Sequence, residues 1–247
     1  SSSQIEKIRI VIKKIEERTK YYIGVAMEES TFLARSQNVG ILTKEEVLLY
    51  GAVGPTARAS DVPRDVRKDD PYAAYAEMPF DVATAKTNDV HGRTVVRMLE
   101  ALESCKIIRY VVDNLPDGEI RVKVPLKIPV GEALSRYEAP RGEDVHYIAA
   151  NGTDKPERVR VRAPTLANWV ATKHMLLKGY IADAPLVVAA IDPCFSCTDR
   201  AVTVVDTDGR TLDWKHIREK SIATYKERGV DFSRVKLMEK KIISHSR

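Results

Sequence analysis

The sequence predicts an α+β fold with a core of long helices and a small antiparallel β-sheet. Two regions with helical periodicity, residues 5–27 and 92–115, predict the long helices. Between residues 120 and 162, short stretches of alternating apolar and polar residues are separated by Gly and Pro, which is typical of antiparallel strands. The chain shows neither a repeat nor a low-complexity linker.

The composition excludes several classes of protein. With 247 residues, 44% of them hydrophobic, the chain is long enough to bury a substantial core. The 40 basic and 35 acidic residues are mixed along the chain, so we expect no nucleic-acid partner. No apolar run approaches the ~18 residues that a membrane span needs. The three cysteines are too few for a secreted disulfide framework and favour a reducing compartment.

The first helix is predicted from the N-terminus to about Met27 because apolar residues recur every three or four positions between charged ones. Thr43 and Glu46 form a capping-box pattern before a short helix that Gly51 ends. The predicted apolar stripe of the first helix comprises Ile5, Ile8, Ile12, Ile15 and Tyr22.

Residues 51–81 are predicted to form a long ordered loop, because Gly, Pro and paired charges replace any sustained periodicity. Long loops of this kind usually carry function. The charge mixture itself is typical of a solvated ion-pair network. The charged residues of its part at 54–72 are Arg58, Asp61, Arg64, Asp65, Arg67, Lys68, Asp69 and Asp70.

The second long helix is predicted over residues 92–115. We expect Cys105, within this helix, to be a small buried apolar residue. A further helix is expected over 165–178, followed by an apolar segment from 181 that leads into Asp192. Asp208 and Gly209 predict a hairpin turn, and a charged helix is expected over 216–226.

Cys194 and Cys197 form a C-x-x-C pair. The pattern has three interpretations: a redox dithiol, half of a zinc or iron-sulfur site, or coincidence. The surrounding pattern offers no βαβ unit for a thioredoxin-like dithiol. Neither Cys105 nor the five scattered histidines supply the second ligand pair of a zinc site, so the chain carries at most half a site.

The stretch IDPCFSCTDR resembles the C-terminal metal motif of nickel-iron (NiFe) hydrogenase large subunits. Its final Arg200 resembles the membrane-bound, energy-converting (group 4) type. GPTARASDVPRDVRKDDPYAAY and YEAPRGE resemble segments that this type shares with the homologous quinone-site large subunit of respiratory complex I. The resemblance runs in order from about Ile5 to Arg200. Complex I relatives lack the two cysteines, so it points to a hydrogenase-like member.

The resemblance implies that the predicted fold is that of these large subunits and that Cys194 and Cys197 are metal ligands. Cys194 would be a terminal ligand of nickel (Ni), and Cys197 would bridge nickel and an iron (Fe) that carries cyanide and carbon monoxide. Soft thiolates suit both metals. A complete centre needs two further cysteines from a more N-terminal segment, so we expect these residues to be the C-terminal part of a longer subunit or one half of a split subunit.

The resemblance also implies catalytic roles for Arg141 and Asp192 beside Cys194. From the residues alone, such an arginine is more often part of a surface salt bridge, here with Glu138 or Glu143. The resemblance reverses this: Arg141 would lie over the open metal face, hydrogen-bond a cyanide and assist hydrogen cleavage. Asp192 would support the pocket, although an Asp before Pro often caps a turn. His146 matches a family histidine near the site, although a lone His is more often a satisfied core residue.

Two positions depart from the family pattern. Ala190 replaces a Ser that often hydrogen-bonds the second cyanide, and Asp144 replaces an apolar residue that commonly lines the gas path. Both changes concern the finer chemistry of the site. For the charged loop at 54–72, the resemblance implies a proton path or a partner interface as the alternative to a solvated network.

The function that the resemblance implies is reversible proton reduction to hydrogen, coupled to ferredoxin oxidation and ion translocation. The implied partners are a small iron-sulfur electron-transfer subunit, the N-terminal half of the large subunit, membrane ion-translocating subunits, ferredoxin and a maturation protease. We expect a peripheral subunit on the cytoplasmic side of a membrane. Residues 1–200 would belong to the hydrogenase large-subunit fold. Residues 201–247 would be an extension that either is removed by such a protease on maturation or is kept, as in a branch of the family that retains its tail. The alternative is a related sulfur-reducing or complex I-like subunit without a working nickel site.

Overall fold

The computed structural model describes residues 2–119, 121–177 and 179–198, with short pieces at 204–205, 208–212, 219, 222–223 and 226–227. The chain divides into two compact units, Ser1–Asp199 and Arg200–Arg247, and each is treated by itself. Arg200 and most of the helix predicted over 216–226 lie outside the described residues. In the second unit, β4 (Val204–Val205) pairs antiparallel with β5 (Thr211–Leu212). This pairing confirms the hairpin predicted at Asp208 and Gly209.

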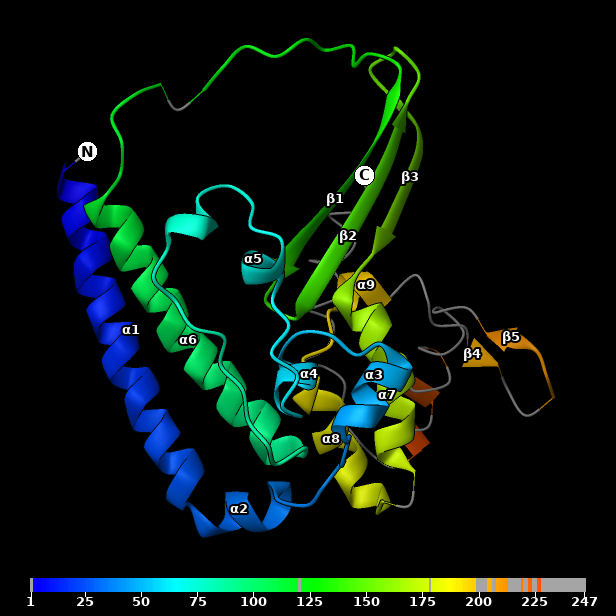
Figure 1. Ribbon diagram of the computed structural model, residues 1–247. Coiled ribbons are helices and arrows are strands. Elements are labelled where there is room, and N and C mark those ends of the chain that lie inside the picture. The colour runs from blue at the N-terminus through cyan, green and yellow to red at the C-terminus, as the bar shows by residue number, and fades with distance from the viewer. Residues whose placement is uncertain are drawn as a thin grey trace. The chain divides into compact units, whose positions relative to one another are not determined.

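Two long helices, α1 (Ser2–Glu28) and α6 (Val90–Asp113), run side by side (Figure 1). Their bounds confirm both predicted helices to within a few residues. The predicted stripe of α1 is only partly covered, since Ile12 is buried while Ile8 and Ile15 remain exposed. Cys105 is buried in α6, as expected. None of the helices in the described part of the chain is long and apolar enough to cross a membrane.

Short helices connect and support this pair. α2 (Ser30–Ser36) follows α1 and was not predicted from the sequence. Its N-cap is Glu29, whose side chain accepts hydrogen bonds from the backbone nitrogens of Thr31 and Phe32. Glu is an uncommon residue at the N-cap of a helix, so this signal is hard to recognise. α3 (Lys44–Tyr50) begins with the predicted capping box of Thr43 and Glu46. It ends at Gly51 in the left-handed conformation, also as predicted.

The predicted loop at 51–81 is ordered and contains three short helical turns. These are α4 (Pro55–Arg58), α5 (Val66–Asp69) and the 3-10 turn η1 (Tyr75–Glu77). Pro55 at the first position of α4 fits the fixed backbone angle that proline supplies at a helix start. The loop therefore folds back over itself and does not extend into solvent as an unstructured connection.

The sheet consists of β1 (Gly131–Ala139), β2 (Gly142–Ala150) and β3 (Pro156–Arg162), in that order and antiparallel. The prediction that strands begin at residue 120 is wrong: residues 121–130 form no strand, and their alternating apolar side chains are exposed. Pro125 and Pro129 remove two backbone donors that a ladder would need, so this stretch pairs with no strand.

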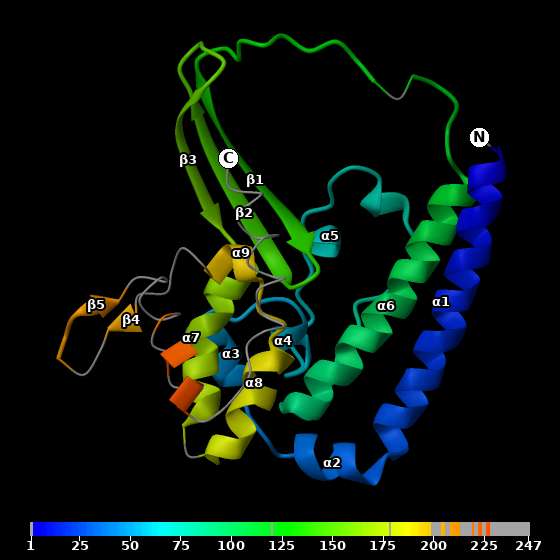
Figure 2. The ribbon, with the colours of Figure 1, turned by 180° about the vertical axis from the view of Figure 1, so that it is seen from behind.

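The remaining helices hold the segment that carries the cysteine pair. α7 (Pro164–Leu176) fits the prediction over 165–178, and a 3-10 turn η2 (Ile181–Asp183) leads into α8 (Ala184–Ala190) and α9 (Phe195–Thr198). Figure 2 shows from behind that α9 lies beside the end of the sheet where β1 turns into β2. α3, α7 and α8 pack together through a buried hydrophobic cluster. This cluster includes Leu42, Val47, Ala171, Val187 and Ile191.

Candidate metal centre

The turn between β1 and β2 carries Arg141, and two glycines hold it in place. Gly142 has φ +126° and Gly54 has φ +66°, both in the region that disfavours side chains. A Cβ on Gly54 would overlap the carbonyl oxygen of Arg141, and a Cβ on Gly142 would lie 2.6 Å from the Gly54 nitrogen. Because neither residue has a side chain, the turn packs directly against the backbone that leads into α4.

The Arg141 side chain reaches across to the segment after α8. Its Nη2 donates to Asp192 Oδ1 at 3.0 Å, and its Nε donates to the Asp192 carbonyl oxygen. The alternative of a salt bridge to Glu138 or Glu143 is wrong, because Glu138 pairs with Arg58 and Glu143 with Arg136 and Arg162. Arg141 is therefore fixed at two atoms on Asp192.

Asp192 is placed by its own backbone as well as by Arg141. It has φ +54°, a left-handed conformation that Asp tolerates better than most residues. Its nitrogen donates to the carbonyl oxygen of Ala189 at 2.9 Å. Its second carboxylate oxygen lies 3.7 Å from Nη1 of Arg97 on α6. Sparsely populated backbone conformations of this kind concentrate at functional sites.

Cys194 and Cys197 lie on one turn. The backbone nitrogen of Cys194 donates to the hydroxyl of buried Thr165 at 3.1 Å. The Cys194 carbonyl oxygen accepts from the nitrogens of Cys197 and Thr198, both at 3.1 Å. This turn brings the two sulfurs within hydrogen-bond reach of one another.

The two thiols have opposite pKa shifts. A hydrogen bond from Cys197, supported by the Ser196 hydroxyl 3.1 Å away, lowers the pKa of Cys194 to about 7. Burial, followed by the hydrogen bond to Cys194, raises the pKa of Cys197. Near neutral pH the pair therefore readily holds one thiolate, Cys194, and one thiol, Cys197. A metal that binds both sulfurs would displace the proton of Cys197.

A polar cluster lies on the face of the sheet towards Cys197. Tyr137 and Asp144 are cross-strand partners, and the Tyr137 hydroxyl donates to Asp144 Oδ2 at 2.7 Å. His146 Nε2 lies 3.3 Å from that hydroxyl and 3.4 Å from the same carboxylate oxygen. Asp144 Oδ1 is buried with no hydrogen-bond partner among the described residues. The charge of Asp144 contributes to the raised pKa of Cys197.

The donor set fits half of a thiolate metal site. Two soft sulfur donors lie on one turn, and the positive charge of Arg141 contributes to the lowered pKa of Cys194. Within the described ranges, no group of three or more His, Cys, Asp or Glu side chains is arranged to hold a metal ion.

A second charged group, the buried ion network, lies beside this site. Arg58 is 1% exposed and its Nε donates to Glu100 at 2.6 Å. Its Nη1 donates to Glu138 at 2.9 Å and lies 3.6 Å from Asp65. Asp65 accepts from Arg67 at 2.6 and 2.9 Å. The prediction that this loop forms a solvated ion-pair network is therefore wrong for Arg58 and Asp65, which are buried.

The structure brings together four of the residues singled out from the sequence: Arg141, Asp192, Cys194 and Cys197. Asp192 does not merely cap a turn, and His146 is not enclosed in a core, since its side chain is 36% exposed. Sequence reasoning missed the contact of Tyr137 with Asp144. The strand register, which pairs residues 137 and 144 about the 140–141 turn, is the signal that would have found it.

The comparisons with known proteins agree with this architecture. A solved archaeal respiratory membrane complex, the membrane-bound sulfane sulfur reductase, contains a chain that superposes with a TM-score of 0.72 at 31% identity. The match covers 77% of this chain and 53% of that one. The fold, helices with a small three-stranded antiparallel sheet, is thus that of the complex I and hydrogenase large subunits.

The chain belongs to the family of the respiratory-chain NADH dehydrogenase 49-kDa subunit, whose model matches residues 1–126 and 122–200. The carbon monoxide-induced hydrogenase of Rhodospirillum rubrum is 44% identical over 67% of this chain and 46% of its own length. An NADH-quinone oxidoreductase subunit of Dehalococcoides mccartyi is 42% identical over 68% of this chain and 46% of its own. Formate hydrogenlyase subunit 5 of Escherichia coli is 35% identical over 87% of this chain and 38% of its own length.

The chain thus spans about half the length of the curated relatives that it matches. These relatives include hydrogenases as well as quinone-linked subunits, so the family by itself supports an oxidoreductase and leaves the type of centre open.

Proposed function

We propose that this chain is part of the catalytic large subunit of a membrane-associated nickel-iron hydrogenase, which reduces protons to hydrogen with electrons from a ferredoxin. The observation that carries the proposal is the pair of thiols on one turn, Cys194 and Cys197, beside the fixed Arg141–Asp192 ion pair. The similarity to the carbon monoxide-induced hydrogenase, at 44% identity, supports it.

In this proposal, Cys194 and Cys197 hold nickel and iron together with two cysteines from a segment outside this sequence. When bound, such a centre supplies the redox chemistry of hydrogen formation. The lowered pKa of Cys194 makes its Sγ available as a thiolate near neutral pH. The same sulfur is the atom on which a proton is held and released during turnover.

Arg141 acts by position and by charge. A guanidinium stays protonated at all ordinary pH values, so its charge is constant through the reaction. The two hydrogen bonds to Asp192 limit its motion and direct it towards the cysteine turn. Donors fixed in this way stabilise developing charge without reorganisation, which is the role that we assign to Arg141 with Asp192.

The proposed assembly follows from the relatives. We propose that residues 1–200 form part of the hydrogenase large-subunit fold and that 201–247 form an extension, removed by a maturation protease. The remaining partners would be a small iron-sulfur subunit and ion-translocating membrane subunits, with this subunit peripheral on the cytoplasmic side. The similarity to a chain of a respiratory membrane complex supports membrane association.

Purification of the matured complex from its native host tests the proposal. We expect hydrogen evolution from chemically reduced ferredoxin, abolished in Cys194→Ser and Cys197→Ser and retained in Cys105→Ser. Cys105 is the matched control because it is buried in α6, away from the cysteine turn. A wild-type complex that evolves no hydrogen would reject the hydrogenase.

A second candidate is a sulfur-reducing or complex I-like enzyme on the same scaffold. The superposition on the sulfane sulfur reductase and the 42% identity to a quinone oxidoreductase subunit favour it. The reaction product distinguishes the two candidates. A complex that forms sulfide from a sulfane sulfur donor, or that reduces quinone, and that forms no hydrogen would favour the second candidate. In either case the cysteine pair would lack a working nickel.

A further inference from the structure

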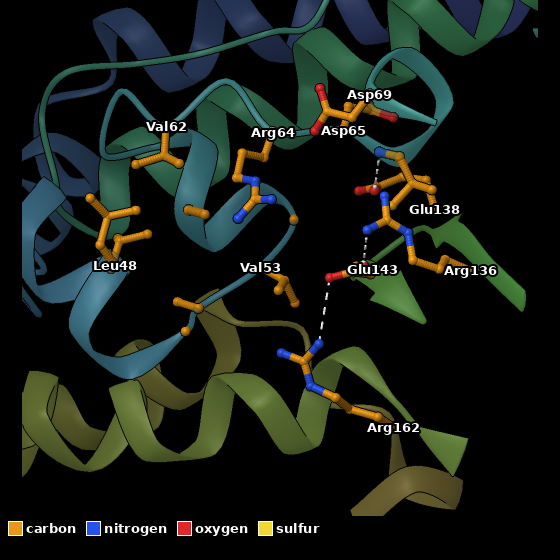
Figure 3. Close-up of a pocket in the computed structure, with 16 residues that line it drawn as sticks. Leu48, Val53, Val62, Arg64, Asp65, Asp69, Arg136, Glu138, Glu143 and Arg162 are labelled. Atoms are coloured by element: carbon orange, nitrogen blue, oxygen red, sulfur yellow. Dashed lines mark hydrogen bonds and ion pairs between the residues drawn. The ribbon is translucent and has the colours of Figure 1, made fainter. Parts of the chain in front are cut away.

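Glu138 on β1 lies between two cavities. One cavity, of about 220 Å³, is lined by side chains from the loop at 47–69 and from the sheet (Figure 3). The other, of about 360 Å³, includes Arg97, Glu100, Glu138 and Asp192 in its wall. Glu138 lines both, although only 4% of its side chain is exposed. A carboxylate in this position is in contact with two separate spaces.

Glu138 shares its cation with other carboxyl groups. The buried ion network contains two guanidinium groups and three carboxyl groups: Arg58, Arg67, Asp65, Glu100 and Glu138. Asp65 also pairs with Arg67, and Glu100 also feels the charge of Arg97, whereas the ion pair of Glu138 is with the shared Arg58. Because a buried and weakly paired charge is costly, this arrangement favours a proton on Glu138.

The other elements packed against Glu138 supply no second ion pair to it among the described residues. On β2, Glu143 lies directly opposite Glu138 but pairs with Arg136 and Arg162. On the segment after α5, the Tyr72 hydroxyl accepts from the Glu138 backbone nitrogen. On α6, Arg97 lines the same cavity but lies beside Asp192 and Glu100.

Glu138 is the carboxyl group of the network that is best suited to hold a proton. Burial raises the pKa of Glu138, and although Arg58 opposes this, the charge of Asp65 adds to it. At Asp65, burial alone would raise the pKa, but the hydrogen bond from Arg67 lowers it. Each Glu138 oxygen accepts one hydrogen bond, Oε1 from Arg58 at 2.9 Å and Oε2 from the Val66 nitrogen at 3.1 Å. Lone pairs therefore remain on which a proton can be bound.

We infer that Glu138 is a proton-relay residue, which takes up a proton from the cavity of Figure 3 and releases it into the cavity that reaches Asp192. The inference rests on the proposed function, since a proton-consuming centre at the cysteine pair needs such a route. Both cavities have room for several water molecules, each of which takes about 30 Å³ in the liquid. One O–H bond forms and one breaks at the Glu138 carboxyl, so no other reactant is needed.

The test compares Glu138→Gln with Glu143→Gln in the full-length subunit within its complex. Both glutamates line the cavity of Figure 3, but only Glu138 also lines the cavity that reaches Asp192. We expect Glu138→Gln to lower kcat by about 10-fold or more, with KM for the electron donor and metal content unchanged. We expect Glu143→Gln to behave as wild type. Equal turnover in wild type and Glu138→Gln would overturn the inference.

A second measurement does not depend on turnover. Infrared difference spectra across a pH titration report a protonated carboxyl group, whose band moves in heavy water. We expect this band in wild type and Glu143→Gln, a shifted band in Glu138→Asp, and none in Glu138→Gln. If the wild-type complex evolves no hydrogen, the proposed function fails while this band still decides whether Glu138 exchanges a proton. A band that persists in Glu138→Gln would overturn the inference.

Discussion

The Arg141 guanidinium and the Asp192 carboxylate lie 3.0 Å apart, although 51 residues separate them in the sequence. This contact joins the turn of the sheet to the segment that carries the cysteines. Through this contact the YEAPRGE and IDPCFSCTDR stretches, which are distant in the sequence, form one site.

The hydrogen bonds of Arg141 predict that charge alone is insufficient for its role. In Arg141→Lys the positive charge remains, but the two-point contact with Asp192 is lost. We expect turnover of the assembled complex to fall about 100-fold. Arg136→Lys, on the strand that leads into the same turn, is the matched control because Arg136 pairs with Asp70 and Glu143 instead. Similar losses in both variants would contradict the role of Arg141.

The contact of Gly54 with the Arg141 turn predicts a steric effect. Gly54→Ala would place a methyl group against the Arg141 carbonyl oxygen in addition to the strain of φ +66°. Gly51→Ala introduces the same kind of strain at φ +64° with no atom within 4 Å. We expect Gly51→Ala to cost about 1–2 kcal/mol of unfolding free energy and Gly54→Ala clearly more, measured by urea denaturation. Equal costs would show that the turn is not held by this close approach.

The buried ion network predicts a large stability effect of Arg58. Arg58→Met leaves three carboxyl groups without their shared partner, which we expect to cost about 3–5 kcal/mol. Arg109→Met removes an exposed ion pair with Glu16 and should cost at most about 1 kcal/mol. Urea denaturation of both variants compares the two costs. Equal stability losses would mean that the Arg58 contacts contribute no more than a surface pair.

The lowered pKa of Cys194 predicts selective alkylation of the metal-free subunit. Above its pKa of about 7, Cys194 is mostly thiolate and should react rapidly with iodoacetamide, with a half-maximal rate near neutral pH. Burial raises the pKa of Cys105, which should remain unmodified in the folded protein. Mass spectrometry of the two peptides across a pH series measures both. A half-maximal rate near pH ~9, typical of a free thiol, would contradict the hydrogen bond from Cys197.

Much of the fold follows from local sequence signals. The apolar periodicity of α1 and α6, the Thr43 capping box and the Gly51 stop act within a few residues, so they can be recognised in the sequence. The stretch at 121–130 has the alternation of a strand but pairs with no strand, because pairing depends on a neighbour that local pattern does not specify. The Glu29 cap of α2 uses a residue type that is uncommon at that position.

The site could be predicted only in part. The cysteine spacing identified Cys194 and Cys197, and the family resemblance identified Arg141 and Asp192. The burial of Arg58 could not be read from a stretch with so many charges, because burial arises from packing of α4 against α6 and from carboxylates on two distant elements. For the same reason the sequence alone predicts only a surface contact between Glu138 and Arg141.

The central claim, that Cys194 and Cys197 form half of a nickel-iron site, is tested most directly by metal analysis of the full-length subunit purified with its complex. We predict nickel in equimolar amount with the subunit, lost in both Cys194→Ser and Cys197→Ser and retained in Cys105→Ser. A matured, active wild-type complex without nickel, or nickel content unaffected by the loss of either cysteine, would contradict it.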